Sequence, residues 1–115
     1  MIIDDEPDVA ELMKLVLENE GYHVGHFLDP RKGLAAVRDF DLLVLDMLMP
    51  GMSGLEILSE LRRKGVVIPV LIVSALDLDD GLKKEFSERY PDVEYLSKLR
   101  IHKDMAKAVR AKLRK

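Results

Sequence analysis

The sequence predicts an α/β fold in which helices cover both faces of one parallel sheet. Along the 115 residues, five short apolar runs alternate with segments of helical periodicity. Strict alternation of strands and helices is typical of a parallel sheet joined by right-handed crossovers. The central run, residues 42–45, is continuously apolar, as expected for a strand buried on both sides. Polar residues directly follow several of these apolar runs. They would lie at the carboxyl edge of the sheet, where such sheets bind ligands.

Composition limits the class of protein. A chain of 115 residues is long enough for one domain, and 48% apolar with 34% charged residues is typical of a globular protein. The net charge of −3 and the aromatic content of 5% give no indication of a nucleic-acid or lipid surface. The absence of cysteine excludes disulfides, thiolate metal sites and thiol nucleophiles. No membrane-length apolar run or signal peptide is recognisable, so we expect a cytoplasmic location.

The first unit combines a short strand at residues 1–3 with a helix that begins near Pro7 and ends at Gly21. Proline suits the first turn of a helix, where its missing N–H costs nothing, and glycine is a common stop signal. Three acids separate the strand from the helix: Asp4, Asp5 and Glu6. We therefore expect an acidic cluster at the carboxyl end of the first strand.

The second unit is a strand at residues 22–27 and a short helix that runs from Pro30 to about Arg38, with Asp29 as its N-cap. His23 and His26 lie in this strand. Strand residues three apart point to opposite faces, so we expect two surface histidines rather than a metal-binding pair.

The third strand, residues 42–45, ends at a single carboxylate, Asp46. Proline and glycine then mark a loop, and Ser53 is placed to cap a helix that ends at Gly65. The fourth strand is expected at residues 70–73, with Ser74 directly after it. A helix is predicted between Asp77 and residue 90.

The fifth strand is expected at residues 93–96, and Lys98 follows it closely. The final helix carries an apolar stripe of Ile101, Met105, Val109 and Leu113. Its many basic residues are typical of a solvated face near a helix C-terminus.

Parallel strands bring the residues at their carboxyl ends to one rim of the sheet. These residues are Asp4, Asp5, Asp46, Ser74 and Lys98. Carboxylates held together repel one another, and a hard cation such as Mg²⁺ relieves that repulsion. A lysine ammonium and a serine hydroxyl suit phosphoryl oxygens, and a carboxylate is a competent nucleophile toward phosphorus. Taken singly, each residue is more typical of a helix cap or a solvated charge; together they predict a phosphoryl site.

Longer motifs carry a family resemblance. They are IIDDEP (2–7), ENEGYHV (18–24), LLVLDMLMPGMSGLEIL (42–58), PVLIVSA (69–75) and YLSK (95–98). The chain resembles the receiver domain of bacterial two-component response regulators. The resemblance implies a single receiver domain over residues 1–115. It also implies a flavodoxin-like (βα)5 three-layer sandwich whose parallel five-stranded sheet has the order 2-1-3-4-5.

By the same resemblance, Asp46 is the phosphoacceptor and takes a phosphoryl group from the phosphohistidine of a sensor histidine kinase or a phosphotransfer protein. The implied Mg²⁺ ligands are Asp5, Asp46 and the backbone carbonyl of Leu48, with Asp4 acting through water. The implied product is an aspartyl phosphate that stores a signal, so the domain is expected to be a switch without substrate turnover.

The resemblance further implies that Ser74 and Lys98 grip the phosphoryl group and that Ser74 and Tyr95 form the switch. The response would appear on the face of helix 4, strand 5 and helix 5, which is also a possible homodimer surface. No membrane partner and no direct nucleic acid binding by this domain are expected.

The sequence departs from the family pattern in several places. Leu99 follows Lys98, where the family usually has a proline in a cis peptide. Leu48 and Leu76 fall beside the phosphoryl site at positions that are often polar, which predicts restricted access for water and a long-lived phosphoryl group.

Two other functions stay open at this point. One is a receiver-like protein-binding module that is never phosphorylated. The other is a Mg²⁺-dependent phosphohydrolase with an aspartyl nucleophile. Such enzymes commonly carry a second acid two residues after the nucleophile, where this chain has Leu48, so the hydrolase is less favoured.

Overall fold

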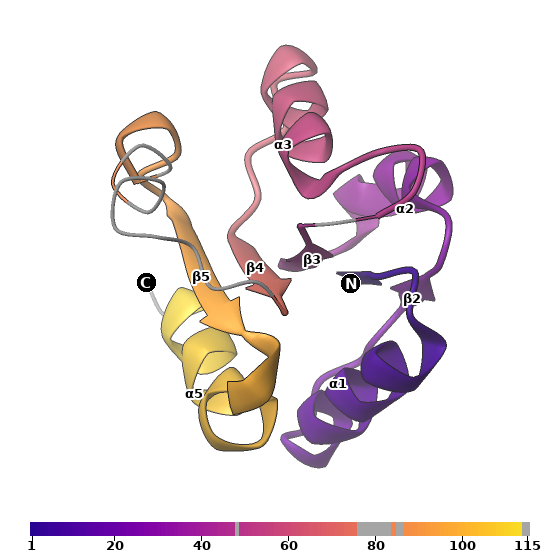
Figure 1. Ribbon diagram of the computed structural model, residues 1–115, viewed down its shortest axis with the longest axis vertical. Coiled ribbons are helices and arrows are strands. Elements are labelled where there is room, and N and C mark those ends of the chain that lie inside the picture. The colour runs from indigo at the N-terminus through magenta and orange to yellow at the C-terminus, as the bar shows by residue number, and fades with distance from the viewer. Residues whose placement is uncertain (48, 76–83, 85–86, 114–115) are drawn as a thin grey trace.

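The computed structural model describes residues 1–47, 49–75, 84 and 87–113. Its five parallel strands form one sheet in the order β2-β1-β3-β4-β5, as predicted (Figure 1). The strands are β1 (Ile2–Ile3), β2 (His26–Phe27), β3 (Leu43–Asp46), β4 (Val70–Ser74) and β5 (Val93–Ser97).

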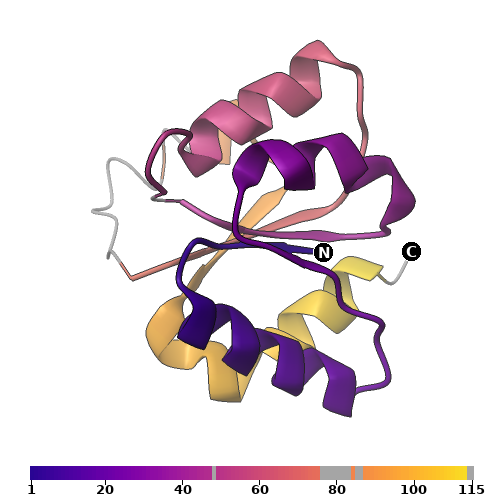
Figure 2. The same cartoon turned by 90° about the vertical axis from the view of Figure 1, so that its right-hand side faces the viewer.

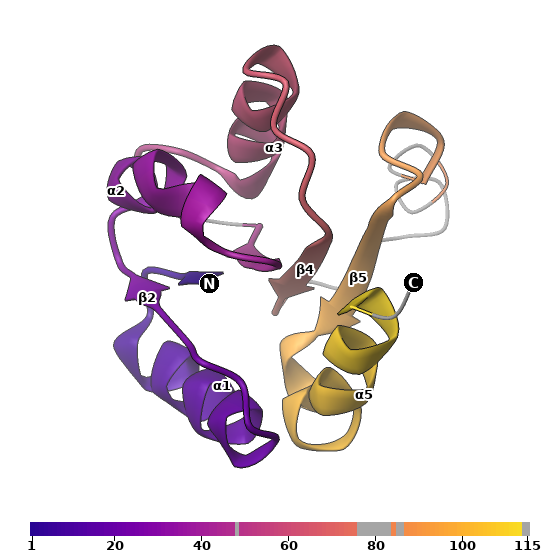
Figure 3. The same cartoon turned by 180° about the vertical axis from the view of Figure 1, so that it is seen from behind.

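Helices cover both faces of the sheet. They are α1 (Pro7–Asn19), α2 (Pro30–Ala36), α3 (Gly54–Arg63) and α5 (Ile101–Leu113). Figure 2 shows α1 and α5 on one face of the sheet and α2 and α3 on the other, and the reverse view in Figure 3 shows the same grouping. Two short 3-10 helices, Val37–Asp39 and Lys98–Arg100, follow α2 and β5. The three-layer sandwich predicted from the sequence is therefore confirmed.

Side chains of the central strands alternate between two apolar cores. Leu43 and Leu45 of β3 belong to the core beneath α2 and α3. Leu42 and Val44 belong to the core beneath α1 and α5. Successive strand residues point to opposite faces, so a strand with a helix layer on each side needs an unbroken apolar run. This explains why the run that leads to Asp46 is continuously apolar.

Local signals set the ends of several helices as expected. Ser53 and Glu56 form a capping box at the start of α3, in which Ser53 Oγ accepts a hydrogen bond from the Glu56 N–H at 3.2 Å. Asp29 Oδ1 accepts one from the Arg31 N–H at 2.9 Å at the start of α2. Gly65 follows α3 with a positive φ of 69°, a conformation that favours glycine.

The second strand is shorter than predicted. Only His26 and Phe27 are in β2, because its partner β1 also has two residues and pairs with them one to one. Residues 22–25 precede this pairing. The predicted second helix also ends earlier, at Ala36, and continues as the 3-10 helix.

The helix predicted between Asp77 and residue 90 lies mostly outside the described residues, since residues 76–83 and 85–86 are not among them. Leu48 and Leu76, which are predicted to lie beside the phosphoryl site, are also outside the described residues. Within the described part of the chain, no helix combines the length and the apolar character that a bilayer crossing requires.

Candidate functional site

Two buried carboxylates leave neighbouring strands at the same edge of the sheet. Ile3 of β1 pairs with Leu45 of β3, so the next residues, Asp4 and Asp46, follow side by side. Asp4 is 0% exposed and Asp46 is 3% exposed. Removing a charged carboxylate from water is costly unless it gains a partner. The pair therefore marks a place where positive charge is required.

Ser74 lies on the next strand at the same level. Asp46 pairs with Val73 of β4, and Ser74 is one residue farther along. Its side chain is buried, at 1% exposed. The strand register thus brings the predicted hydroxyl beside the predicted phosphoacceptor.

Backbone contacts fix Asp4 in place. Its Oδ1 accepts a hydrogen bond from the Glu6 N–H at 2.9 Å, which turns the chain from β1 into α1. His26 Nε2 lies 3.1 Å from the backbone carbonyl oxygen of Asp4. His26 is half-buried, so the expectation that it is a plain surface residue is wrong. His23 is exposed, as expected. Spacing within a strand does not indicate which neighbouring loop a histidine will contact.

Gly54 lets the start of α3 pack against the end of β3. A Cβ atom built on Gly54 would lie 2.7 Å from the backbone oxygen of Asp46 and 2.9 Å from Cα of Met47. The Gly54 N–H donates to the carbonyl oxygen of Met47 at 2.9 Å. No other residue fits this approach without movement of the backbone, so Gly54 helps to fix the position of Asp46.

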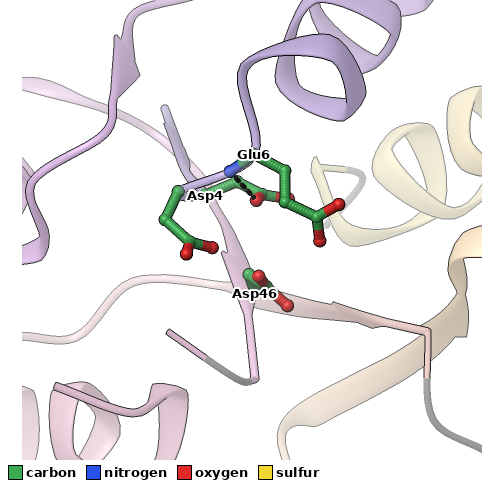
Figure 4. Close-up of side chains that lie close together, drawn as sticks. Asp4, Glu6 and Asp46 are labelled. Carbon is green, nitrogen blue, oxygen red and sulfur yellow. Dashed lines mark hydrogen bonds between the residues drawn. The ribbon is translucent and has the colours of Figure 1, made fainter. Parts of the chain in front are cut away.

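Four carboxylates gather at this edge: Asp4, Asp5, Glu6 and Asp46. One oxygen from each lies within 4.8 Å of the others. Figure 4 shows the Asp4, Glu6 and Asp46 side chains together, with the dashed hydrogen bond from the Glu6 N–H to Asp4. Oxygen ligands at this density suit Mg²⁺. Asp4 Oδ2 accepts no hydrogen bond from any residue that the structure describes, and its cationic partner there is the Lys98 ammonium at 3.3 Å. The carbonyl of Leu48, the other predicted ligand, is outside the described residues.

Lys98 brings a positive charge to the cluster. Its Nζ lies 2.7 Å from Glu6 Oε1, 3.3 Å from Asp4 Oδ2 and 3.4 Å from Asp46 Oδ2. The Lys98 side chain is only 9% exposed. Burial alone lowers the pKa of Lys98, but the hydrogen bond to Glu6 and the charges of Asp4 and Asp46 outweigh it, so the pKa is raised above its ordinary value. Lys98 therefore stays an ammonium.

The predicted switch aromatic, Tyr95, lies on β5 beside Ile72 of β4. It is half-buried and packs against the core beneath α2 and α3. Tyr95 thus stands on the outer strand of the sheet, the strand that ends directly before Lys98.

Residues 1–110 match the family described as the response regulator receiver domain. The chain belongs to this family. A receiver domain of a two-component system is consistent with the fold and with the acid pocket at its sheet edge.

Curated relatives and solved structures agree with this assignment. The receiver domain is 32% identical over 120 residues to the DNA-binding response regulator MtrA of Mycolicibacterium smegmatis, and the alignment covers 100% of this chain and 50% of MtrA. The chain thus spans half the length of that relative.

Solved receiver domains superimpose on it closely. That of the Francisella response regulator 1452 is 25% identical, with a TM-score of 0.83, and the match covers 97% of this chain and 93% of that one. TrrA of Thermotoga maritima, solved in complex with Mg²⁺ and BeF, is 29% identical, with a TM-score of 0.81 and coverage of 97% and 96%.

Sequence reasoning assigned no role to Glu6 in the site. The available signal was its place as the third acid in a row, immediately before the proline that starts α1. Its contact with Lys98 spans 92 residues, and the sequence gives no measure of how two flexible side chains meet across such a distance.

Proposed function

We propose that Asp46 is the phosphoacceptor of this receiver domain. One carboxylate oxygen of Asp46 attacks the phosphorus of a phosphohistidine on a sensor kinase or phosphotransfer protein. The P–N bond breaks, and the histidine keeps its electron pair and takes up a proton. The observation that carries this proposal is the position of Asp46 at the end of the central strand, with Lys98 Nζ at 3.4 Å.

Mg²⁺ fits the acid pocket as the cofactor. Asp5 and Asp46 would hold it directly, together with the Leu48 carbonyl, and Asp4 would act through water. When bound, the ion neutralises charge on the phosphoryl oxygens. The Mg²⁺ and BeF complex of TrrA supports the same use of this pocket in the receiver domain described here.

Lys98 and Ser74 complete the phosphoryl site. The ammonium of Lys98 would move part of its ion pairing from the carboxylates to the phosphoryl oxygens. The Ser74 hydroxyl would donate a hydrogen bond to the phosphoryl oxygens. Both groups are already held at the sheet edge, Lys98 by three carboxylates and Ser74 by the end of β4. Little reorganisation is therefore required when the phosphoryl group arrives.

The signal would leave the site through Ser74 and Tyr95. Movement of the Ser74 hydroxyl toward the phosphoryl group opens space beside β4, and Tyr95 on the adjacent strand would turn inward. The output face would comprise β5, α5 and the helix before β5, with a homodimer as one use of it. We propose that residues 1–115 form one receiver domain that works in the cytoplasm.

A stoichiometry experiment separates the switch from an enzyme with turnover. We expect acetyl phosphate with Mg²⁺ to load one phosphoryl group per chain, and a phosphomonoester to be hydrolysed no faster than in buffer. Many turnovers on the phosphomonoester would instead support the phosphohydrolase. No loading at all would support a binding module that works without phosphorylation.

A further inference from the structure

Glu6 is the nearest partner of the Lys98 ammonium, although Glu6 is the most exposed of the three acids around it. The Nζ–Oε1 distance is 2.7 Å, against 3.3 Å to Asp4 and 3.4 Å to Asp46. The Glu6 side chain is 56% exposed, whereas the aspartates are buried. Lys98 therefore makes its closest contact at the outer rim of the pocket.

The carboxylate of Glu6 has no other structural task within the described residues. Glu6 is the N-cap residue of α1, but its side chain makes no capping hydrogen bond. Its backbone N–H donates to Asp4, and a glutamine would preserve that bond. The hydrogen bond to Lys98 is thus the contact for which the charged side chain matters.

Lys98 and a divalent cation are attracted to the same carboxylates. An ammonium seated on Asp46 and Asp4 neutralises the charge that would bind the cation and repels the cation directly. The more exposed carboxylate of Glu6 offers the ammonium a third partner besides the two buried acids. The position of Lys98 therefore affects how open the pocket is to Mg²⁺.

We propose that Glu6 is a positioning residue that draws the Lys98 ammonium toward the outer rim of the pocket and so weakens its competition with a divalent cation for Asp4 and Asp46. This inference rests on the proposed function, because it concerns the same Mg²⁺ pocket. It adds a role for a residue that is outside the proposed phosphoacceptor and the proposed set of Mg²⁺ ligands. Glu6 acts through Lys98, and it lets the lysine and the metal share one site.

The test is a double-mutant cycle read as the Mg²⁺ dissociation constant, measured by isothermal titration calorimetry on the unphosphorylated protein. Glu6→Gln keeps the shape and removes the charge, and we expect it to weaken Mg²⁺ binding about two- to fivefold, the range that an exposed ion pair supports. Lys98→Gln should tighten binding, because it removes a competing cation. In the Lys98→Gln background, Glu6→Gln should cause a smaller loss than in the wild type.

Two further variants control for net charge and for folding. Glu11→Gln removes an exposed charge from α1 outside the cluster, and it should leave Mg²⁺ affinity near the wild-type value. Glu6→Asp keeps the charge but withdraws it by one methylene from Lys98, so it should weaken binding in the same direction as Glu6→Gln. This variant tests the contact even if Lys98→Gln folds poorly.

An equal loss from Glu6→Gln with and without Lys98 would overturn the inference, because Glu6 would then act as a simple charge. Wild-type affinity in Glu6→Asp or Glu6→Gln would overturn it too. Such results would leave the proposed function intact, provided that the wild type binds Mg²⁺ and BeF. A wild type that binds neither would instead refute the proposed function.

Discussion

The ammonium of Lys98 lies 3.4 Å from the Asp46 carboxylate, although no proline follows the lysine. The turn after β5 is held by a different device. Ser97 Oγ accepts a hydrogen bond from the Leu99 N–H at 3.2 Å and caps the 3-10 helix that begins at Lys98. A proline at this position could not donate that bond. Within the described residues every peptide bond is trans, so Lys98 reaches the pocket without a cis peptide.

Removing the cap should loosen Lys98. We expect Ser97→Ala to lower stability by about 1 kcal/mol, the usual cost of losing a helix cap, and to weaken BeF binding at saturating Mg²⁺ several-fold. Urea unfolding and a BeF titration measure the two effects. Leu99→Ala is the matched control, because it trims a side chain that is 88% exposed and keeps the N–H. Unchanged BeF binding in Ser97→Ala would show that the cap does not position Lys98.

Substitution of Gly54 by alanine should destabilise the fold, although helix propensity alone would favour alanine. Alanine is the better helix former, but its Cβ would lie 2.7 Å from the Asp46 carbonyl oxygen. We expect Gly54→Ala to cost about 1–3 kcal/mol by overpacking and to shift the backbone amide signals of Asp46 and Met47 in NMR spectra. Wild-type or greater stability would contradict the close packing of α3 on the end of β3.

Mg²⁺ should stabilise the receiver domain because it binds the folded acid pocket. At a free Mg²⁺ concentration 100 times the dissociation constant, ligand linkage predicts an increase of about 2.7 kcal/mol in the free energy of unfolding. Thermal unfolding with Mg²⁺ and with a chelator measures this, and NaCl at the same ionic strength controls for screening. Asp46→Asn should remove most of the increase in Tm. An increase that NaCl reproduces would indicate screening of repelling carboxylates rather than a site.

The ion pairs of Lys98 should stabilise the folded state up to an alkaline pH, above which their contribution is lost. Its pKa is raised above the ordinary value of 10.5 by Glu6, Asp4 and Asp46. A raised pKa in the folded state means that the stabilisation is complete below pH 10.5 and is lost as the pH rises through the higher folded value. Lys98→Met should therefore be less stable than the wild type at pH 8, and the difference should narrow only above about pH 10.5. A difference that narrows between pH 8 and 10 would contradict the raised pKa.

The layered fold could be predicted because its signals are local and repeated. The unbroken apolar run before Asp46 requires a helix layer on each side, and the capping box at Ser53 marks the start of α3 within one residue. Asp4, Asp46 and Ser74 followed from one rule, that parallel strands share a carboxyl edge. Each of the three lies where that rule places it.

Contacts between distant side chains could not be predicted in the same way. The bounds of β2 depend on how much of β1 is available to pair with it, which its own residues do not reveal. The Glu6–Lys98 and His26–Asp4 contacts depend on loop geometry and rotamers rather than on periodicity. Leu99 shows a similar limit. Its presence in place of a proline indicates that the turn after Lys98 has changed, but it does not indicate that Ser97 caps this turn.

Mass spectrometry of the receiver domain after incubation with acetyl phosphate and Mg²⁺ tests the central claim most directly. Reductive trapping of the acyl phosphate followed by peptide sequencing identifies the modified residue. We predict one phosphoryl group per chain, carried by Asp46, that requires Mg²⁺ and is absent in Asp46→Asn. A phosphoryl group on another residue, or equal labelling of Asp46→Asn, would contradict the assignment of Asp46 as the phosphoacceptor.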